Sequence, residues 1–397
     1  MSPLFTTRRT ILKTAPLGAA VVATTNPWGA VAFADPAAPI RKPLPERYFY
    51  DYGTNAETRW DSVDRRRYRT QPERLFVRNH TTTPTIDPRT YRLAIHGDGL
   101  RAPRGADAPV ELSLAQLKRI GRTHRTAIHE CTGNGRSYFA SQQGQTVSGT
   151  PWKLGAVGAV TWEGVRLADV LRHLGVSRDA VDVMATGLDP SYVDKGVDYG
   201  AVRRPFPVAK ALDDALLAWG ANGAPLLPDH GYPLRLVVPG WIGIASIKWL
   251  GSLEVSTKTL TSPWNTKWYR LTGGDYPEGL PPLTELPVKS AWELPETAEL
   301  PRAGGKLLHG RSWSGAGRIL HVEVSTDGGN RWKRVDLLEH GSAWSRWVFR
   351  WPGAAAGDHT LMARATDVRG RTQPLVTPLN SAGYLFDAVV RHQVHVA

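Results

Sequence analysis

The chain has 397 residues, with 49 lysines and arginines against 36 aspartates and glutamates, which gives a formal net charge of +13 at pH 7. Its single cysteine excludes an internal disulfide, and no apolar stretch reaches the roughly 18 residues that a membrane-spanning helix needs. A basic chain attracts nucleic acid, anionic membrane or small anions. No lysine-rich tail or RNA-binding signature is present, so we expect small anions and neither nucleic acid nor a membrane span.

The N-terminus has the three parts of an export signal in order. Paired arginines occur in TTRRTILK at residues 6–13, a short alanine-rich apolar run follows at residues 15–23, and AFAD offers a small-x-small cleavage site after Ala34. This pattern predicts a twin-arginine signal peptide over residues 1–34. We therefore expect the mature protein in the periplasm, the cell envelope or the extracellular space. That route carries folded proteins, often with cofactors already inserted.

The region from about residue 35 to about residue 270 mixes strand and helix signals. TYRLAIHG at residues 90–97 alternates as a strand does. LSLAQLKRI at residues 112–120 begins with a serine cap and has helical apolar spacing. GVRLADVLRHLGV at residues 164–176 predicts an amphipathic helix that ends at Gly175, and YPLRLVVPG at residues 232–240 predicts a strand stopped by proline and glycine.

A Pro/Gly-rich passage at residues 271–287 predicts a domain boundary, and strand signals dominate after it. RILHVEVS and RWKRVDLL flank the tight turn TDGGN at residues 326–330, which predicts a hairpin. WSRWVFRW at residues 344–351 and HTLMARATD at residues 359–367 alternate as two further strands. Several short strands with regular turns indicate an antiparallel sandwich over residues 271–397.

Cys131 lies in a glycine- and asparagine-rich stretch, HECTGNGRSYF. A zinc site would need more cysteine or histidine ligands at short spacing, and no second cysteine is present. A nucleophile would need a histidine base and an orienting partner; twelve histidines keep this role open, although no protease-like motif surrounds the cysteine. The remaining alternatives are an inert buried thiol and a single thiolate ligand to a soft, cofactor-borne metal.

Several separated motifs, in this order, resemble those of the sulfite oxidases and sulfite dehydrogenases that use a molybdenum–molybdopterin cofactor. They are LFVRNHTTTPTIDPRTYRLAIHG (75–97), ECTGNGRSYF (130–139), GLDP (187–190), LPDHGYPLRLVVPGWIGIASIKWLG (227–251), Tyr269 and VEVSTDGGNRW (322–332). The resemblance implies an α+β fold. A molybdopterin-binding catalytic domain would span residues 35–270, and an immunoglobulin-like β-sandwich dimerisation domain residues 271–397.

The resemblance also implies residue roles. Cys131 would be the one protein thiolate on molybdenum, with Gly133 and Gly135 letting the backbone approach the cofactor closely. Arg78 and Arg136 would hold the substrate anion, because a guanidinium is a permanently charged fork of donors. The other implied catalytic positions are Tyr269, as a phenol donor, and Trp152, as a pocket wall. The other implied cofactor-binding positions are Phe76, Val77, Asn79, His80, Asp189, His230, Arg235, Ser246, Ile247 and Lys248.

Three of these positions, His230, Arg235 and Lys248, match those that bind the phosphate of the pterin in the family, while Asp189 matches a carboxylate that accepts from the pterin ring. Taken singly, such residues would be interpreted as surface or satisfied core groups. Tyr384 is a departure, because animal enzymes of the family carry a substrate-pocket arginine there. This difference leaves the exact substrate open.

The expected activity is molybdenum-dependent oxidation of sulfite, or a related small sulfur oxyanion, by a homodimer. Because the chain has no C-x-x-C-H attachment, we expect no haem in it and an external acceptor such as a c-type cytochrome. One alternative keeps the cofactor: a sulfane-sulfur dehydrogenase subunit of a thiosulfate-oxidising complex, or a sulfoxide or nitrate reductase. Another alternative is a cofactor-free exported protein that binds anions. It would explain the charge and the sandwich, but neither the use of a twin-arginine signal nor the spacing of Cys131.

Overall fold

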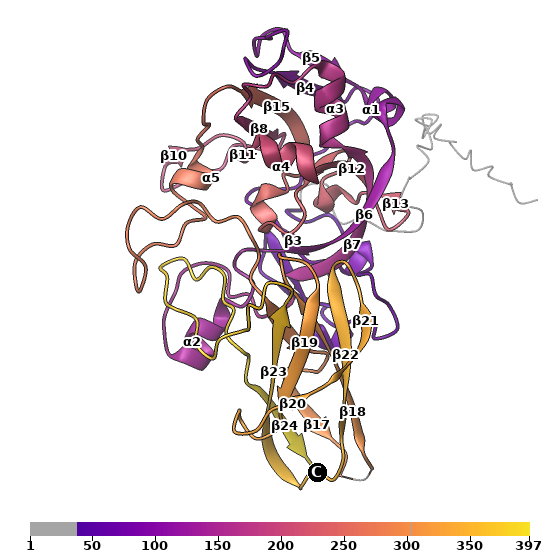
Figure 1. Cartoon of the computed structure of the whole chain (residues 1–397), viewed down its shortest axis with the longest axis vertical. Coiled ribbons are helices and arrows are strands. Elements are labelled where there is room, and N and C mark those ends of the chain that lie inside the picture. The colour runs from indigo at the N-terminus through magenta and orange to yellow at the C-terminus, as the bar shows by residue number, and fades with distance from the viewer. Residues whose placement is uncertain (1–37, 303) are drawn as a thin grey trace, which may run out of the picture.

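The computed structural model describes residues 38–302 and 304–397. The predicted signal peptide at residues 1–34 lies outside them and stays a prediction. Two β-rich parts follow one another along the chain, a mixed part with the helices and then a sandwich that ends at the C-terminus (Figure 1). No helix within the described ranges is long and apolar enough to cross a membrane. The α+β class with a C-terminal sandwich is confirmed.

Two five-stranded sheets form the first part. One sheet has the order β11 (Arg203–Pro207), β8 (Asp182–Gly187), β15 (Leu250–Ser256), β4 (Leu93–His96), β5 (Val110–Leu112). The other has the order β13 (Ala224–Pro225), β12 (Leu216–Ala221), β7 (Val157–Arg166), β6 (Thr123–Glu130), with β14 (Arg235–Val237) also on β12. Only β4 and β15 pair in parallel within these two sheets; their other pairs are antiparallel.

Shorter elements complete this part. A three-stranded sheet holds β1 (Phe49–Asp51), β2 (Asn55–Thr58) and β3 (Val77–Arg78), and β9 (Val193–Asp194) pairs with β10 (Val197–Asp198). The α-helices are α1 (Leu114–Ile120), α2 (Ser137–Gln143), α3 (Leu167–Leu174), α4 (Val208–Asp213) and α5 (Pro263–Thr266). Single 3-10 turns occur at η1 (Trp60–Ser62), η2 (Pro72–Arg74), η3 (Pro228–His230) and η4 (Gly243–Ala245).

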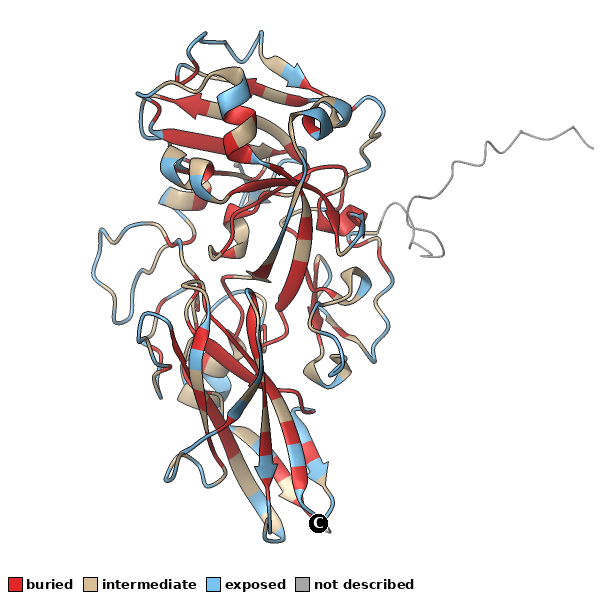
Figure 2. Cartoon of the chain, turned by 45° about the vertical axis from the view of Figure 1, so that its right-hand side comes forward, coloured by how far each residue is buried: buried red, intermediate tan, exposed pale blue. Residues whose placement is uncertain are grey.

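The sandwich packs two sheets face to face. Its first sheet has the order β16 (Lys289–Trp292), β18 (Lys306–Trp313), β22 (Trp344–Trp351), β21 (Asp336–His340). Its second has the order β17 (Thr297–Leu300), β24 (His392–Val396), β23 (Gly357–Asp367), β19 (Ile319–Ser325), β20 (Lys333–Arg334). Buried and exposed residues alternate along the sandwich strands, as Figure 2 shows, because successive side chains point to opposite faces of a sheet.

Most elements predicted from local patterns are confirmed. α1 begins after Ser113, whose side chain accepts from Gln116 N in a capping box, and α3 ends at Gly175 with φ +79°. The predicted hairpin after the TDGGN turn is only partly correct. β20 pairs with β19, but the chain then leaves that sheet at Val335, and β21 pairs with β22 in the other sheet. The segment RWKRVDLL, predicted as one strand, is therefore divided between β20 and β21, because the chain passes from one sheet of the sandwich to the other there.

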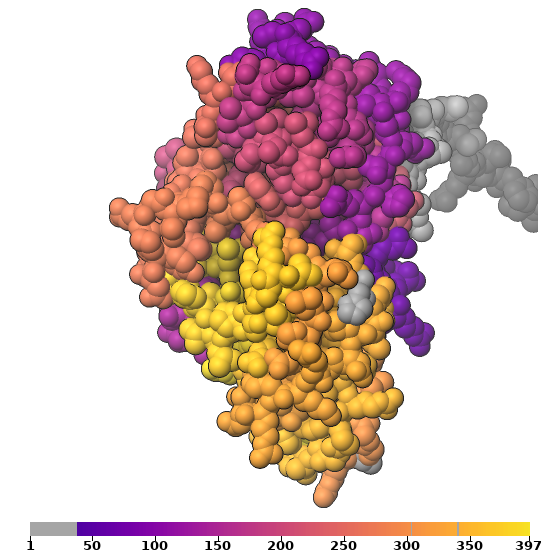
Figure 3. Space-filling model, in the orientation of Figure 1, coloured from indigo at the N-terminus to yellow at the C-terminus, as the bar shows by residue number. Residues whose placement is uncertain are grey.

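The two parts share a continuous interface (Figure 3). Trp313 and Trp344 of the sandwich belong to the hydrophobic core of the first part, and Trp60 stacks on Trp313 at 6.0 Å between ring centroids. After β23 the chain returns to the first part, where Leu385 N donates to Thr132 O at 2.9 Å. The passage at residues 271–287 between α5 and β16 holds no helix or extended strand.

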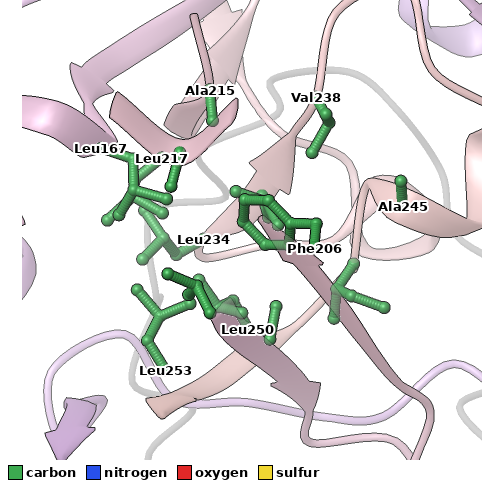
Figure 4. Close-up of a cluster of buried hydrophobic side chains, with 14 of the residues drawn as sticks. Leu167, Phe206, Ala215, Leu217, Leu234, Val238, Ala245, Leu250 and Leu253 are labelled. Carbon is green, nitrogen blue, oxygen red and sulfur yellow. The ribbon is translucent and has the colours of Figure 1, made fainter. Parts of the chain in front are cut away.

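The core of the first part supports the segments that carry the site. Figure 4 shows Phe206 between leucines of β12, β15 and α3, with Val238 and Ala245 beside it. All of these side chains are buried, so the backbone that runs from β14 through η4 into β15 packs against a close-packed core. This backbone carries Arg235, Ser246 and Lys248, which all face a single cavity.

Candidate active site

A cavity in the first part gathers side chains from several separated segments of the chain. β3 and the residues after it supply Arg78 and His80, the turn after β6 supplies Cys131, and η3 with β14 supplies His230 and Arg235. Twelve residues predicted as site residues line it: Phe76, Arg78, Asn79, His80, Cys131, Asp189, His230, Arg235, Ser246, Ile247, Lys248 and Tyr269. Segments up to about 190 residues apart in sequence thus meet as the motifs implied.

Cys131 lies at the end of β6 in a tight turn. Its N–H donates to Ala156 O at 2.9 Å, and its carbonyl accepts from Asn134 N at 2.9 Å. A Cβ on Gly133 would lie 2.6 Å from the Arg136 guanidinium, so the glycine also makes room for this side chain. Gly135 has φ +94°, and a Cβ on it would lie 3.0 Å from Phe386 of the C-terminal segment.

Two buried cations in the cavity have no anionic partner. Arg235 donates to His230 O and Ser246 O at 3.0 Å each, and its Nη2 lies 3.3 Å from His129 Nε2. Lys248 donates to Asp229 O at 2.9 Å and to the Asn79 side chain. Within the described part of the chain, no carboxylate lies within ion-pair distance of either. A buried charge is costly unless it is paired, so this end of the cavity fits an anionic group such as a phosphate.

Burial lowers the pKa values of both of these cations. Burial lowers the pKa of Arg235 to about 9. Burial, and then the Arg235 guanidinium, hold the pKa of Lys248 well below its ordinary value. The nearby Asp229 carboxylate already accepts from the backbone N–H groups of Arg41 and Lys42, at 2.9 and 2.7 Å. A bound dianion would raise both pKa values toward their ordinary range.

Two further arginines lie close to Cys131. The Arg78 side chain donates to Asn79 O at 2.6 Å. Arg136 donates through Nε to Ala382 O and through Nη1 to Thr150 O, both at 2.9 Å, and lies over the Tyr384 ring at 5.5 Å. Burial would lower the pKa of Arg78, but Tyr269 and Cys131 hold it above its ordinary value. Among the described residues neither arginine has an ion-pair partner, so both are available to an anion beside the thiol.

Two aromatic side chains lie near the same arginines and thiol, and of these Tyr269 lines the cavity. The rings of Tyr269 and Tyr384 stack at 5.2 Å with an interplanar angle of 8°. Tyr269 Oη lies 3.2 Å from His80 Nε2, and burial raises the pKa of Tyr269 above its ordinary value. The phenol therefore stays protonated at neutral pH and can donate a hydrogen bond. Tyr384 arrives from the C-terminal segment, so the sandwich part of the chain contributes to the site.

Three predicted residues lie behind or beside the cavity lining. Trp152 is buried one layer back, edge-to-face with Phe76 at 6.3 Å, so it supports the wall but does not form it. Val77 points into a small core with Phe49. Arg136 is not among the lining residues, although it lies close enough to interact electrostatically with the Cys131 thiol. Val77 points away from the cavity because neighbouring residues on a strand, here Val77 and Arg78 of β3, face opposite ways.

Two titratable lining residues, His129 and Asp229, are absent from the predicted site residues. His129 lies on β6, two positions before Cys131, which directly follows the strand, and this spacing puts both side chains on the same side of the chain. Its ring stacks on Phe76 at 5.5 Å, and burial holds its pKa well below the ordinary value. Asp229 adjoins His230 in η3. Within the described residues no cluster of three His, Cys, Asp or Glu side chains could hold a metal ion, so a metal here would bring most of its ligands with it.

Comparison with known proteins agrees with this geometry. Residues 80–264 match the family described as oxidoreductase molybdopterin binding domain, and residues 281–397 match the Mo-co oxidoreductase dimerisation domain. The human mitochondrial sulfite oxidase is 36% identical over 346 residues, covering 81% of this chain and 60% of that protein. The sulfite oxidase of Gallus gallus is 34% identical over 329 residues, covering 78% of this chain and 68% of that protein.

A solved structure is also similar over nearly the whole chain. The crystal structure of the sulfane dehydrogenase SoxCD from Paracoccus pantotrophus aligns with a TM-score of 0.72 and 25% identity, covering 95% of this chain and 96% of that one. Fold, cation-rich cavity and single thiol together define a molybdopterin-binding oxidoreductase. The chain belongs to the sulfite oxidase family. The match spans about 60% of the length of the human relative.

Proposed function

We propose that this protein oxidises sulfite to sulfate at a molybdenum–molybdopterin cofactor and passes the electrons to an external acceptor such as a c-type cytochrome. The observation that carries the proposal is the placement of Arg78 and Arg136 around the thiol of Cys131, where neither has an anionic partner among the described residues. Paired guanidinium groups match a small oxyanion in charge and in donor geometry. The family supplies the expectation that the oxyanion contains sulfur.

Cationic side chains and the Cys131 thiolate would hold the cofactor in the cavity. Arg235, Lys248 and His230 would bind its phosphate at one end, and the Cys131 thiolate would ligate the metal at the other. Burial raises the pKa of Asp189 to about 6, and a donor from the pterin ring would keep this carboxylate ionised. When bound, the cofactor supplies the oxo-transfer and two-electron chemistry.

The chain's own residues then have defined tasks. Arg78 and Arg136 would position the anion and neutralise its charge beside the thiol. Tyr269 is protonated and lies 3.2 Å from His80 Nε2; when substrate and cofactor are bound, it would turn its single hydroxyl proton from that nitrogen into the reacting region. Burial of the whole cluster limits access of bulk water, which strengthens each of these electrostatic interactions.

A second candidate uses the same cofactor on a sulfane sulfur. The similarity to SoxCD over 95% of this chain favours it, as does Tyr384, which is uncharged where animal sulfite oxidases place a third cation. A sulfoxide or nitrate reductase has no comparable support from the site. Two arginines and a stacked tyrosine pair would still accept sulfite, so we place the sulfane reaction second.

Assembly and location extend the proposal. We propose a homodimer formed through the sandwich, supported by the match of residues 281–397 to a dimerisation domain. We also propose export through the twin-arginine route, supported by the order of paired arginines, apolar run and cleavage site in residues 1–34. Sedimentation of the purified protein and the location of a tagged full-length chain test these two points.

The deciding experiment is single-turnover reduction of the molybdenum-loaded protein, followed optically. Sulfite is mixed first, and oxidised cytochrome c is then added to the reduced protein. Thiosulfate, a sulfoxide and nitrate are the comparison substrates. Rapid reduction by sulfite and re-oxidation by cytochrome c support the proposal. A loaded protein that ignores sulfite contradicts it, and a purified protein that takes up no molybdenum under replete conditions removes both candidates.

A further inference from the structure

The carboxylate of Glu130, immediately before Cys131, is fully buried and receives three hydrogen bonds. Asn134 Nδ2 donates to Oε1 at 2.8 Å from within the same turn. The other two donors come from the sandwich: Lys289 Nζ donates to Oε1 at 2.8 Å, and Trp313 Nε1 donates to Oε2 at 2.8 Å. A charged pair joining the sandwich to the cysteine turn is thus sealed from water.

The same lysine holds both ends of the turn. Lys289 Nζ also donates to Asn134 O at 2.8 Å, while Asn134 Oδ1 accepts from Ala156 N at 3.0 Å. Cys131 lies between the two residues that the ammonium group joins. Moving the turn would break several charge-assisted hydrogen bonds at once.

The opposite side of the turn is also blocked. A Cβ on Gly243 of η4 would lie 2.6 Å from Glu130 O and 3.6 Å from Cys131 Cα, so backbone packs directly against backbone there. The turn is therefore clamped between η4 of the first part and strands β16 and β18 of the sandwich. A buried ion pair often adds little to stability compared with apolar residues of the same volume. A role in fixing geometry accounts better for this network.

We propose that Lys289 and Trp313 are positioning residues for the Cys131 thiol, so that the sandwich sets the geometry of the metal ligand as well as contributing to assembly. This inference rests on the proposed role of Cys131 as the ligand. It extends that role to two residues that lie 158 and 182 positions further along the chain and touch neither the cavity nor the substrate region.

The test uses Cys131 as its own probe, because it is the only cysteine of the chain. The rate of alkylation by iodoacetamide is measured on cofactor-free protein under native conditions. We expect Lys289→Met, and the charge-balanced pair Lys289→Met with Glu130→Gln, to change this rate at least about fivefold, because the turn loses its common anchor. The balanced pair avoids leaving an unpaired buried charge and keeps the test usable where the single variant does not fold.

A matched control exists in the same interface. Arg311 and Glu293 form a buried ion pair within the sandwich, with Nε to Oε1 at 2.5 Å, and Arg311 also donates to Asp64 O and Arg67 O of the first part. This pair does not contact the cysteine turn. Arg311→Met with Glu293→Gln should leave the alkylation rate within about twofold of wild type. Equal changes in both balanced pairs, or no change in the Lys289 pair, would overturn the proposal.

Loaded protein separates this inference from the proposed function. If Cys131 is the ligand, cofactor shields it from alkylation in wild type, whereas equal rates with and without cofactor would remove the ligand role and this inference with it. Where shielding holds, the Lys289 pair should shift the sulfur-to-molybdenum absorption band and lower kcat with little change in KM, because both arginines remain in place. An unshifted band with wild-type kcat would overturn the positioning role alone.

Discussion

The phenol oxygen of Tyr269 lies 3.2 Å from Nε2 of His80, and the same nitrogen receives a hydrogen bond from Trp264 Nε1 at 3.3 Å. An indole N–H can only donate, so Nε2 of His80 carries no proton. Burial, and then the Arg78 guanidinium, hold the pKa of His80 well below its ordinary value. A neutral imidazole therefore fixes the Tyr269 ring without ionising it.

Replacing Tyr269 with phenylalanine removes the donor and keeps the ring stacked on Tyr384. We expect kcat for the proposed reaction to fall about 100-fold, the scale of a general acid or hydrogen-bond donor in a transition state. Molybdenum content should not change. Tyr276→Phe, in the passage between the two parts, is the matched control. Steady-state kinetics with wild-type kcat would remove the phenol from the reaction.

Replacing Arg136 with glutamine should raise the sulfite KM about 10- to 100-fold while leaving molybdenum bound. The reason is the loss of one charge-assisted interaction, worth about 1.5–3 kcal/mol. Arg125→Gln is the control, because Arg125 is an exposed partner of Asp214 at 3.5 Å. Unchanged kinetics in the Arg136 variant would show that this side chain only donates hydrogen bonds to Thr150 O and Ala382 O and does not bind the substrate.

Replacing Cys131 with serine should abolish turnover and remove the sulfur-to-molybdenum absorption band that the thiolate contributes. The cations at the other end of the cavity remain, so cofactor should still be detected by metal analysis and pterin fluorescence. Serine keeps the size and the backbone of the turn, which separates the thiol from the fold. Full activity in this variant would contradict the ligand assignment.

Replacing Arg235 with methionine should weaken cofactor retention at least about tenfold, because the phosphate loses charge-assisted donors. Arg204→Met is the matched control: Arg204 is also a buried guanidinium held by carbonyl oxygens, but it lies outside the cavity lining. Molybdenum content after dialysis measures the difference. Equal losses in both variants would indicate general destabilisation and not a phosphate site.

The cofactor-free protein should lose stability in acid. Burial holds the pKa values of His80, His129 and His230 well below 6.5. Below pH 6.5 the unfolded chain binds protons that the native state does not, so stability present above that pH is lost as the pH falls, by about 1.4 kcal/mol per pH unit for each imidazole. His129→Gln should flatten this dependence by about one proton.

Two buried carboxylates act in the opposite direction. Burial raises the pKa of Asp189 to about 6 and that of Glu57 to about 7, so their contribution to stability falls as the pH rises from about 4 to those values. Burial also raises the pKa of Asp387, and it lowers the pKa values of His309, His321 and His392. The imidazoles therefore still outnumber the carboxylates, and the net trend keeps its sign. Urea unfolding between pH 7.5 and 4.5 measures it, with exposed His124→Gln as control. A stability independent of pH would contradict the burial of these histidines.

The local elements and the chemical character of the site could be predicted from the sequence. The serine cap of α1, the glycine end of α3 and the alternating strands of the sandwich depend on hydrogen bonds and periodicity within a few residues, and such signals are legible in the chain. The resemblance of the motif segments to a known family implied the molybdenum–molybdopterin cofactor, whereas the residues alone left the role of Cys131 open. The motifs that carry this resemblance depend on residue type and short spacing.

Which of these groups meet, and in what layer they lie, could be seen only in the folded chain. Trp152 lies behind Phe76, Arg136 turns toward Tyr384, and Glu130 finds its cation 159 residues away on Lys289. Each of these placements depends on how the sandwich and the returning C-terminal segment pack on the cysteine turn. Packing of distant segments is set by shape and burial across the whole core, and no local pattern in the sequence records it.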